Sequence, residues 1–576
     1  MASDGEVWWF APRLIVFGKA MSNKKTVDEW RGLLTSLRQS NIKVVQGVKE
    51  SLFPFLKFSY DNLPGNVKKC FLFTSMLQGK SNYELLESWM GLGLLSDFVN
   101  LQEAYEEAKS ILKILEESCL LYFSDYGDVH LHDVIYDMAM WIASDCGWIV
   151  QKYDGSAEIS TNDTENWRDA KQVIIDGIKL LPVLSHQCSD LLSLMIANSH
   201  SLEIIPKGFS LQVPNLKYLD LSRSGIKELP KDIKCLVNLQ YLNVSCTGIS
   251  SLPMQLVSLN KLQYLICRDL IGLGKIKDGI ISKLHRLKVV DLYPHGWVEP
   301  KELEILKKHI KAIGMRVSSQ EVLEQLSCLP TTQLYIENLE KLISLSFDTL
   351  SCKNQGSLHE LKIRSCPQLK EIVMNGSGTH LNNLTIYDIK KLQCITWGPD
   401  ISPAEYFHVL KKLFICECNL ASFAWVLHLP CLSHLRIQNC AVKETLFYVE
   451  DEREMQQVLE GPVFPRLENL ELTMLERLVS ISNFALNFPR LSLLSVHECP
   501  NLKKLPFKHG INNSQIINID CDRKWWKNLE WDDATIPSHL SPTCQWYDYH
   551  LYHYVPQSYY MLDLFSDENT DACTIS

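Results

Sequence analysis

One short pattern, repeated along most of the chain, constrains the fold more than any other feature. The segments Asn215–Pro230 and Asn238–Pro253 align without a gap, and Lys261–Ile266 continues the series. All three share the kernel LxxLxL. A unit of this size cannot bury its own leucines, so it becomes stable only when neighbouring units stack on it. The chain must therefore form a stacked array of small units rather than an ordinary globular core.

Thirteen copies of the kernel can be followed when its central residue is taken as a marker. The markers are Leu194, Leu219, Leu242, Leu265, Val290, Ile313, Leu334, Leu361, Leu384, Leu413, Leu435, Leu470 and Leu494. Most steps between them fall within the 20–29 residues typical of leucine-rich repeats. The alternation of apolar and polar residues predicts short strands whose leucines point into the core. The sequence therefore predicts an α/β solenoid, a leucine-rich-repeat horseshoe with parallel strands.

Cysteines recur at one position of the repeat. Cys366, Cys418, Cys440 and Cys499 each stand five residues after a marker, where leucine-rich repeats place a small polar residue. A buried cysteine behaves as a small apolar residue with a weak hydrogen-bond donor. We therefore predict that these cysteines are free and structural, and that they form neither a disulfide nor a metal site.

The residues beside each marker should point away from the core and line a broad concave surface. Around the markers Leu219 to Val290 we predict a partner-binding face made of Tyr218, Asp220, Tyr241, Asn243, Tyr264, Ile266, Arg268, Asp291 and Tyr293. Tyrosine and arginine are enriched among interface hot spots, although tyrosine also suits any exposed strand position. On this hypothesis Tyr241→Ala weakens partner binding at an almost unchanged melting temperature, and Leu242→Ala does the reverse.

The residues before the repeats read as mostly helical. Apolar spacing predicts helices over Val67–Leu77, Tyr83–Met90, Ala104–Glu117 and Asp133–Ser144. Between the last two, residues 118–132 read as a hairpin with a turn rich in Asp and Gly. Helices followed by a two-stranded wing are typical of a winged-helix domain.

Several motifs in this region occur in the order found in one family. They are Phe58–Pro64 (FSYDNLP), Cys70–Leu77 (CFLFTSML), Leu86–Gly93 (LESWMGLG) and Leu131–Ser144 (LHDVIYDMAMWIAS), with a weaker match at Pro12–Met21. With the repeats that follow, the chain resembles plant nucleotide-binding leucine-rich-repeat (NB-ARC/LRR) disease-resistance proteins of the coiled-coil class. The resemblance covers about residues 11–535.

The resemblance implies a nucleotide site. In the family a motif histidine contacts the β-phosphate of ADP, and an ADP/ATP exchange with magnesium switches the receptor. Carried over, these positions are His132, with Asp133 beside it, and Pro12 on the adenine side. The family's GxxxxGK[ST] phosphate loop does not occur in this sequence. We therefore expect no cofactor in this chain, and we interpret the chain as the C-terminal part of such a receptor, truncated at its N-terminus.

The expected domain organisation follows from these patterns. Residues 1–25 are a remnant of the preceding helical NB-ARC subdomain, 26–150 the winged-helix domain, 155–520 the leucine-rich repeats, 521–540 a C-terminal cap and 541–576 a poorly ordered, acidic, Tyr-rich tail.

Composition excludes several function classes. The chain carries 57 basic and 67 acidic groups, a formal charge of −10, which argues against a nucleic-acid partner because phosphate binding needs a concentrated excess of Lys and Arg. No apolar run approaches the roughly 18 residues of a transmembrane helix. The start lacks the basic and apolar stretches of a signal peptide, so we expect a cytoplasmic protein. No catalytic constellation is visible, and we expect no enzyme.

The sequence thus favours an immune receptor, or a fragment of one. The repeats would sense a pathogen effector or a guarded host protein, and could also contact the N-terminal domains of a full-length receptor. The alternative is a leucine-rich-repeat interaction scaffold, or an adaptor of the ubiquitin-ligase type, without nucleotide switching.

Overall fold

The computed structural model describes residues 57, 59–77, 82–123, 129–159, 164–347, 350, 358–376, 378–449, 463–484, 486, 488–505, 517–530 and 540–543. Pro12, the expected remnant 1–25 and residues 544–576 of the expected tail lie outside these ranges. The chain divides into two compact units, Met1–Leu413 and Phe414–Ser576. Each unit is described by itself below.

The first unit opens with a helical region that we call the winged-helix region. It consists of α4 (Gly65–Met76), α5 (Asn82–Gly91), α6 (Leu101–Glu117), α7 (Asp133–Asp145) and a hairpin of β1 (Tyr122–Phe123) and β2 (Val129–His130). The four helices and the hairpin predicted from the sequence are confirmed.

Local chemistry explains where the longest of these helices begins and which side it buries. The side chain of Asn100 caps α6 by accepting a hydrogen bond from the Glu103 amide at 3.0 Å. Along the helix, Ala104, Ala108 and Ile111 recur at helical spacing and are buried. The same cluster of buried side chains holds Trp89 of α5, which is fully inaccessible.

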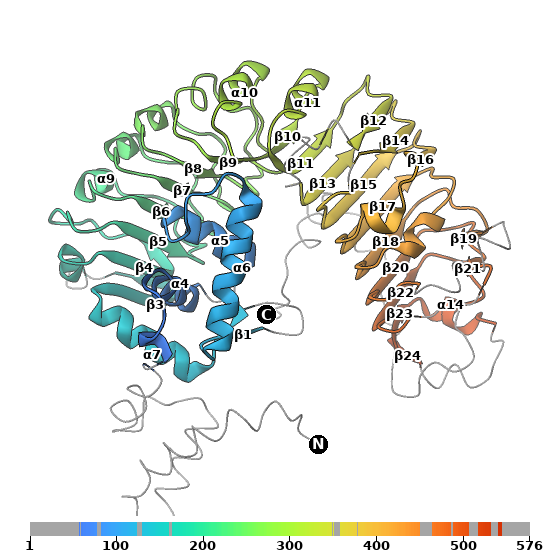
Figure 1. Cartoon of the computed structure of the whole chain (residues 1–576), viewed down its shortest axis with the longest axis horizontal. Helices are drawn as coiled ribbons and strands as arrows, with labels where there is room; N and C mark the ends of the chain where they lie inside the picture. The colour runs from blue at the N-terminus through green and yellow to red at the C-terminus, as the bar shows by residue number, and fades with distance from the viewer. Residues whose placement is uncertain are drawn as a thin grey trace, which may run out of the picture. The chain divides into compact units, whose positions relative to one another are not determined.

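The repeats form a ladder of parallel strands (Figure 1). In the first unit the ladder strands are β3 (Trp148–Glu158), β4 (Gln172–Leu180), β5 (Ser193–Ala197), β6 (Tyr218–Asp220), β7 (Tyr241–Asn243), β8 (Tyr264–Ile266), β9 (Val289–Asp291), β10 (Ala312–Val317), β11 (Thr331–Glu337), β13 (Glu360–Arg364) and β15 (Asn383–Ile389). From Leu194 to Ile313 each marker pairs directly with the next. The solenoid predicted from the sequence is confirmed.

The second unit continues with the same kind of repeat. Its ladder strands are β17 (Lys412–Cys418), β18 (His434–Gln438), β20 (Asn469–Thr473), β22 (Leu493–His497), β23 (Ile517–Cys521) and β24 (Leu540–Thr543). The markers Leu435, Leu470 and Leu494 again pair with one another. Every one of the thirteen markers therefore lies on a ladder strand.

Short helices and small sheets form the rest of each repeat. The helical segments are η2 (Asn166–Arg168), α9 (Phe209–Gln212), η3 (Lys231–Cys235), η4 (Met254–Ser258), α10 (Pro300–Leu306), α11 (Gln320–Leu326), α12 (Pro403–Tyr406), η6 (Ala424–His428) and α14 (Arg523–Lys527). Two further parallel sheets are formed by β12 (Ser344–Ser346), β14 (Glu371–Met374) and β16 (Cys394–Trp397), and by β19 (Thr445–Phe447) and β21 (Ser480–Ser482).

The ladder extends beyond both ends of the expected repeat range. At its start, β3 begins at Trp148, before the expected boundary at residue 155. At its end, β24 pairs with β23, so that Pro542 lies opposite Ile519. Residue 540 of the expected cap and residues 541–543 of the expected tail therefore form a ladder strand. These strands lack the kernel, and β24 contains a proline, which a strand tolerates only at an edge or where no ladder bond is needed.

The turn that ends a ladder strand repeats with the same backbone geometry. After most markers the residue four positions on has a left-handed conformation, for example φ 52° at Glu417 and 47° at Asn439, whereas Pro294 and Val317 do not. The next residue turns its side chain back onto the backbone, as Cys418 does to the Cys416 carbonyl at 3.1 Å. All four cysteines predicted as structural are buried and free, as packing at this repeat position requires. Burial raises the pKa of Cys366, Cys440 and Cys499 to about 11.

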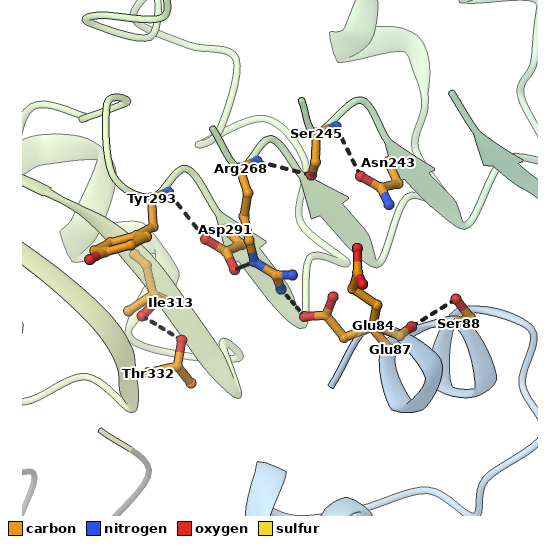
Figure 2. Close-up of polar contacts among 10 residues, drawn as sticks. All are labelled: Glu84, Glu87, Ser88, Asn243, Ser245, Arg268, Asp291, Tyr293, Ile313 and Thr332. Atoms are coloured by element: carbon orange, nitrogen blue, oxygen red, sulfur yellow. Dashed lines mark hydrogen bonds and ion pairs between the residues drawn. The ribbon is translucent and has the colours of Figure 1, made fainter. Parts of the chain in front are cut away.

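A register shift interrupts the pairing of β10 with β11, as others do between β3 and β4. Ile313 lies opposite Thr331, but the next residue, Gly314, lies opposite Gln333, so Thr332 is an extra residue in β11. The Thr332 hydroxyl donates a hydrogen bond to the Ile313 carbonyl at 3.2 Å (Figure 2). Such a β-bulge shifts the register of everything that follows it.

Candidate functional site

The most distinctive site is the contact between the winged-helix region and the ladder. We call the outward-pointing residues of the ladder strands the ladder surface. A continuous cluster of buried apolar side chains joins the winged-helix region to this surface and includes Ile174, Met195, Tyr218, Tyr241, Tyr264, Ile266, Val289 and Ala312. Figure 1 shows α5 on the side of the ladder to which these side chains belong. The part of the ladder surface that ends at Ala312 is the covered part.

A stack of tyrosines forms the centre of this contact. The rings of Tyr218 and Tyr241 are parallel, with centroids 4.3 Å apart, and Tyr264 follows at 6.1 Å. Gly91, the last residue of α5, lies directly on Tyr241, because any β-carbon there would overlap the ring. Glycine at this position therefore allows the end of α5 to approach the ladder closely. The stack and the glycine together fix where the helix sits.

A buried ionic network lies beside the tyrosines. The guanidinium of Arg268 binds Glu87 of α5 and Asp291 of the neighbouring repeat at the same time (Figure 2). The side chains of Glu87 and Asp291 are only 4% and 2% exposed. Burial raises the pKa of Glu87 to about 7, although the neighbouring Arg268 acts in the opposite direction. Burying these charges costs desolvation energy, and the attraction between them offsets that cost only while both partners are present. The pair therefore favours the one arrangement in which Arg268 and the carboxylates meet.

Weaker ion pairs surround the buried network. Glu84 of α5 lies 3.3 Å from Arg223. Asp97, which precedes α6, lies 3.1 Å from Lys288 and 3.4 Å from Lys311. Hydrogen bonding to Lys288, followed by the charges of both lysines, lowers the pKa of Asp97. In all of these pairs the winged-helix region supplies the carboxylate and the ladder supplies the base.

Most of the predicted partner-binding face lies in the covered part, and Tyr293 does not, which corrects one expectation. We expected its residues to be exposed, but Tyr218, Tyr241 and Asp220 are at most 1% exposed, and Tyr264, Ile266 and Asn243 are also buried. The expectation failed because a strand position that points away from the repeat core is exposed only if nothing else packs on it. A role in binding a separate partner stays a prediction for these residues. In this structure Tyr218, Tyr241, Tyr264 and Ile266 belong to the apolar cluster of the winged-helix region.

The polar members of the predicted face have a local role as well. Asp220, Asn243 and Asp291 each accept a hydrogen bond from the amide two residues further on, at 2.9, 3.0 and 3.1 Å. Figure 2 shows the bonds of Asn243 and Asp291. This arrangement is an Asx turn, which ends the strand. Tyr293 points elsewhere and donates to Glu360 at 2.7 Å. Sequence reasoning assigned all nine residues to one surface, whereas the structure divides them among packing, strand ends and a neighbouring cluster.

The predicted nucleotide residues lie apart from this contact. His132 stands at the N-cap position of α7 without a capping hydrogen bond from its side chain, and its ring stacks on Tyr122 of the hairpin with centroids 4.7 Å apart. Asp133 is the first residue of α7 and is exposed. Pro12 lies outside the described residues. The histidine thus lies where the hairpin meets α7, and its proposed role toward a nucleotide stays a prediction.

Sequence reasoning missed the acidic half of the interface. Glu84, Glu87 and Asp97 read as ordinary solvated positions of helices and loops. A signal was present on the other side: basic residues recur near the markers, as Arg223, Arg268, Lys288 and Lys311. A row of bases along one surface of a chain with an acidic excess indicates an acidic partner surface.

Comparisons with known proteins agree with the fold. The family model described as "Leucine-rich repeat region" matches residues 176–515. The chain therefore belongs to the leucine-rich-repeat proteins. An internalin from Listeria monocytogenes, InlF, aligns with 60% of this chain and 89% of its own at 14% identity and a TM-score of 0.34.

The curated relatives are plant disease resistance proteins, as the resemblance implied. The chain is 28% identical to disease resistance protein RPS5 of Arabidopsis thaliana over 92% of its own length and 60% of that protein. It is 30% identical to disease resistance protein SUMM2 of the same plant, over 90% and 58%. The chain thus spans about 60% of the length of the curated relatives it matches. Among the helices of the described ranges, none has the length and apolar character to cross a membrane.

Proposed function

We propose that the chain is the sensing and regulatory part of a cytoplasmic plant immune receptor, acting by protein recognition rather than catalysis. The repeats recognise a pathogen effector or a guarded host protein, and the winged-helix region transmits that event. The similarity to disease resistance proteins along 90% or more of this chain supports the proposal.

The observation that carries the regulatory part is the covered ladder surface. Tyr241 and Arg268 pack against α5 instead of facing a partner. A binding event on the repeats can therefore change the stability of the winged-helix contact, because any ligand that prefers one arrangement shifts the equilibrium toward it. The repeats would both recognise the partner and hold the winged-helix region in place.

A genetic experiment tests the immune role. Plants in which the gene is disrupted are challenged with a panel of pathogen isolates and compared with plants that carry a restored copy. We expect the disrupted plants to lose resistance to at least one isolate. Unchanged resistance across a panel to which the parent line responds would contradict the proposed function.

We also propose that the winged-helix region serves as the switch element of an ADP/ATP-dependent receptor, with His132 as the residue nearest the nucleotide. The chain itself should bind ADP or ATP negligibly, since a single imidazole supplies far less than a cradle of backbone amides. Titration calorimetry with ADP should show no heat of binding. Micromolar binding that disappears in His132→Ala would overturn this expectation and make His132 a ligand-binding residue.

A further inference from the structure

Beyond Ala312 the ladder surface has a different character. The apolar cluster of the winged-helix region ends there, and the strands β10, β11, β13 and β15 follow. Their outward-pointing residues include Arg316, Tyr335, Glu337, Lys362, Arg364 and Tyr387. We call this set, with Tyr293 and Glu360, the open part of the ladder surface. Within it the two arginines are partly exposed, whereas Tyr293, Tyr335, Glu360 and Lys362 are buried.

Glu337 lies at the centre of the open part and is bound by three neighbours. The Tyr335 hydroxyl donates to its carboxylate at 2.8 Å. The guanidiniums of Arg316 and Arg364 lie 3.3 and 3.7 Å from the two oxygens. Two arginines thus share one carboxylate, which leaves a net positive charge at this point. The surface already binds a carboxylate group with a tyrosine and two guanidiniums.

A second carboxylate is bound in the same manner. Glu360 accepts a hydrogen bond from Tyr293 at 2.7 Å and lies 3.5 Å from the Lys362 ammonium. The ammonium also lies over the Tyr293 ring, 5.1 Å from its centroid. The same surface therefore pairs a tyrosine with a base around a carboxylate twice.

The arginines of the open part remain accessible. The side chains of Arg316 and Arg364 are 33% and 31% exposed, compared with 12% for Arg268 in the covered part. Arg364 also stacks over Tyr387, 5.1 Å from the ring centroid, which holds the planar guanidinium in a fixed orientation. Fixed guanidiniums are suited to bidentate recognition of carboxylates.

We propose that the open part is a docking site for an acidic segment of a partner protein, whose Asp or Glu side chains bind Arg316 and Arg364. Glu337 acts as an internal substitute that a partner carboxylate joins or displaces. The inference rests on the proposed function, in which the repeats recognise protein. Charge complementarity supports it: the two guanidiniums share the single carboxylate of Glu337, and both are more exposed than that carboxylate.

The direct test uses the full chain and a fluorescein-labelled oligoglutamate peptide, with an oligolysine peptide for comparison. Fluorescence anisotropy should show binding of the acidic peptide and none of the basic one. Because the contact depends on exposed charges, raising the salt from low to physiological concentration should weaken it severalfold.

Variants locate the binding on the surface. Arg316→Ala/Arg364→Ala should weaken peptide binding at least about tenfold, as expected when central arginines of an interface are truncated. The matched control is Arg168→Ala/Arg286→Ala, which removes the same charge from two exposed positions outside the open part and should leave binding within about twofold. Glu337→Gln should tighten binding, since it frees both guanidiniums from their internal partner. The melting curve of each variant shows whether it is folded.

The outcomes separate the inference from the proposed function. If the peptide does not bind, or binds the control and the Arg316→Ala/Arg364→Ala variant equally, the docking site is wrong even where disruption of the gene abolishes resistance. If Glu337→Gln weakens binding, the assignment of Glu337 as an internal substitute is wrong. Tighter binding of a single-stranded oligonucleotide than of the peptide would also overturn the proposal, because the surface would then be a general polyanion site.

Discussion

The covered and the open parts of the ladder surface are built from the same repeat and from the same kinds of residue, yet they behave differently. In the covered part Tyr241 is 1% exposed and Arg268 is enclosed by two carboxylates. In the open part Arg316 and Arg364 share one carboxylate and remain about one third exposed. The position in the repeat decides which way a side chain points. What packs against it decides whether it supports folding or remains available to a partner.

The difference has an energetic consequence. Removing one member of a buried ion pair leaves an uncompensated charge and typically costs 3–5 kcal/mol. Removing one member of an exposed pair costs about 0–1 kcal/mol. Substitutions of the same type in the two parts should therefore separate stability from recognition.

The largest effect is expected for Tyr241→Ala. The ring is stacked on Tyr218 and covered by Gly91, so its loss leaves a cavity and should cost about 3–5 kcal/mol. This reverses the expectation drawn from the sequence, in which only Leu242→Ala affected stability. Urea denaturation followed by tryptophan fluorescence measures it. The control Tyr448→Ala, at a position 48% exposed, should stay within about 0.5 kcal/mol, and equal midpoints for both would mean that α5 does not pack on Tyr241.

The next effect compares two arginines directly. Arg268→Met leaves the buried carboxylates of Glu87 and Asp291 without their shared base. We expect it to lower the free energy of unfolding by about 3 kcal/mol in the same denaturation experiment. Arg364→Met, in the open part, should cost less than about 1 kcal/mol. A loss of similar size in both variants would remove the distinction between the two parts.

A pH series sharpens the comparison at Glu87. Burial raises the pKa of this carboxyl from the usual 4.5 to about 7, so the folded chain holds a proton that the unfolded chain releases. The contribution of Glu87 to the free energy of unfolding is therefore largest at the acid end and decreases as the pH rises from about 4.5 to 7.

The matched variant isolates that contribution. Glu87→Gln cannot ionise and should flatten the dependence of stability on pH within this window, by roughly 1–3 kcal/mol across it. Glu340→Gln, at an exposed position, should retain the slope of the parent chain. A slope that is the same in all three proteins would mean that Glu87 is not buried in solution.

The smallest effect is expected at the edge of the interface. Asp97 is 80% exposed, and its pairs with Lys288 and Lys311 are screened by salt. Asp97→Asn should lower the melting temperature slightly at low ionic strength and not at high ionic strength. The pKa of Asp97 is lowered, so this contribution should also disappear as the pH falls below the usual range of a carboxyl. A large decrease that persists in high salt would place Asp97 in the buried network.

The sequence predicted the ladder well because the spacing of the repeat determines which residues of neighbouring strands pair. Leu219, Leu242 and Leu265 pair as the spacing required, and Cys418 and Cys440 lie where the turn needs a small donor. Strand β24, which lacks the kernel, escaped notice. Local periodicity predicts repeating units reliably, and it says little about a strand that merely adds to the end of a stack.

The site was harder to predict, because it depends on contacts between distant segments. Glu87 and Arg268 are separated by 181 positions in the chain, and no local pattern connects them. Tyr241 was correctly assigned to the outward side of its strand, and its burial follows only from the position of α5. Exposure is a property of the whole arrangement, so residues read from one strand alone cannot be sorted into stabilising and binding groups.

The extra residue Thr332 has a consequence for engineering by recombination. Repeats can be exchanged between related proteins as cassettes when the strands on both sides keep the same offset. From β4 to β9 the offset within each pair of neighbouring strands is constant, and between β10 and β11 it changes across Thr332, so that Gly314 lies opposite Gln333. A crossover placed before this point preserves the alignment of the remaining rows of side chains. A cassette that lacks the extra residue would shift the side chains of the later strands relative to those of the earlier strands. The covered and the open parts of the ladder surface would then no longer keep their present alignment.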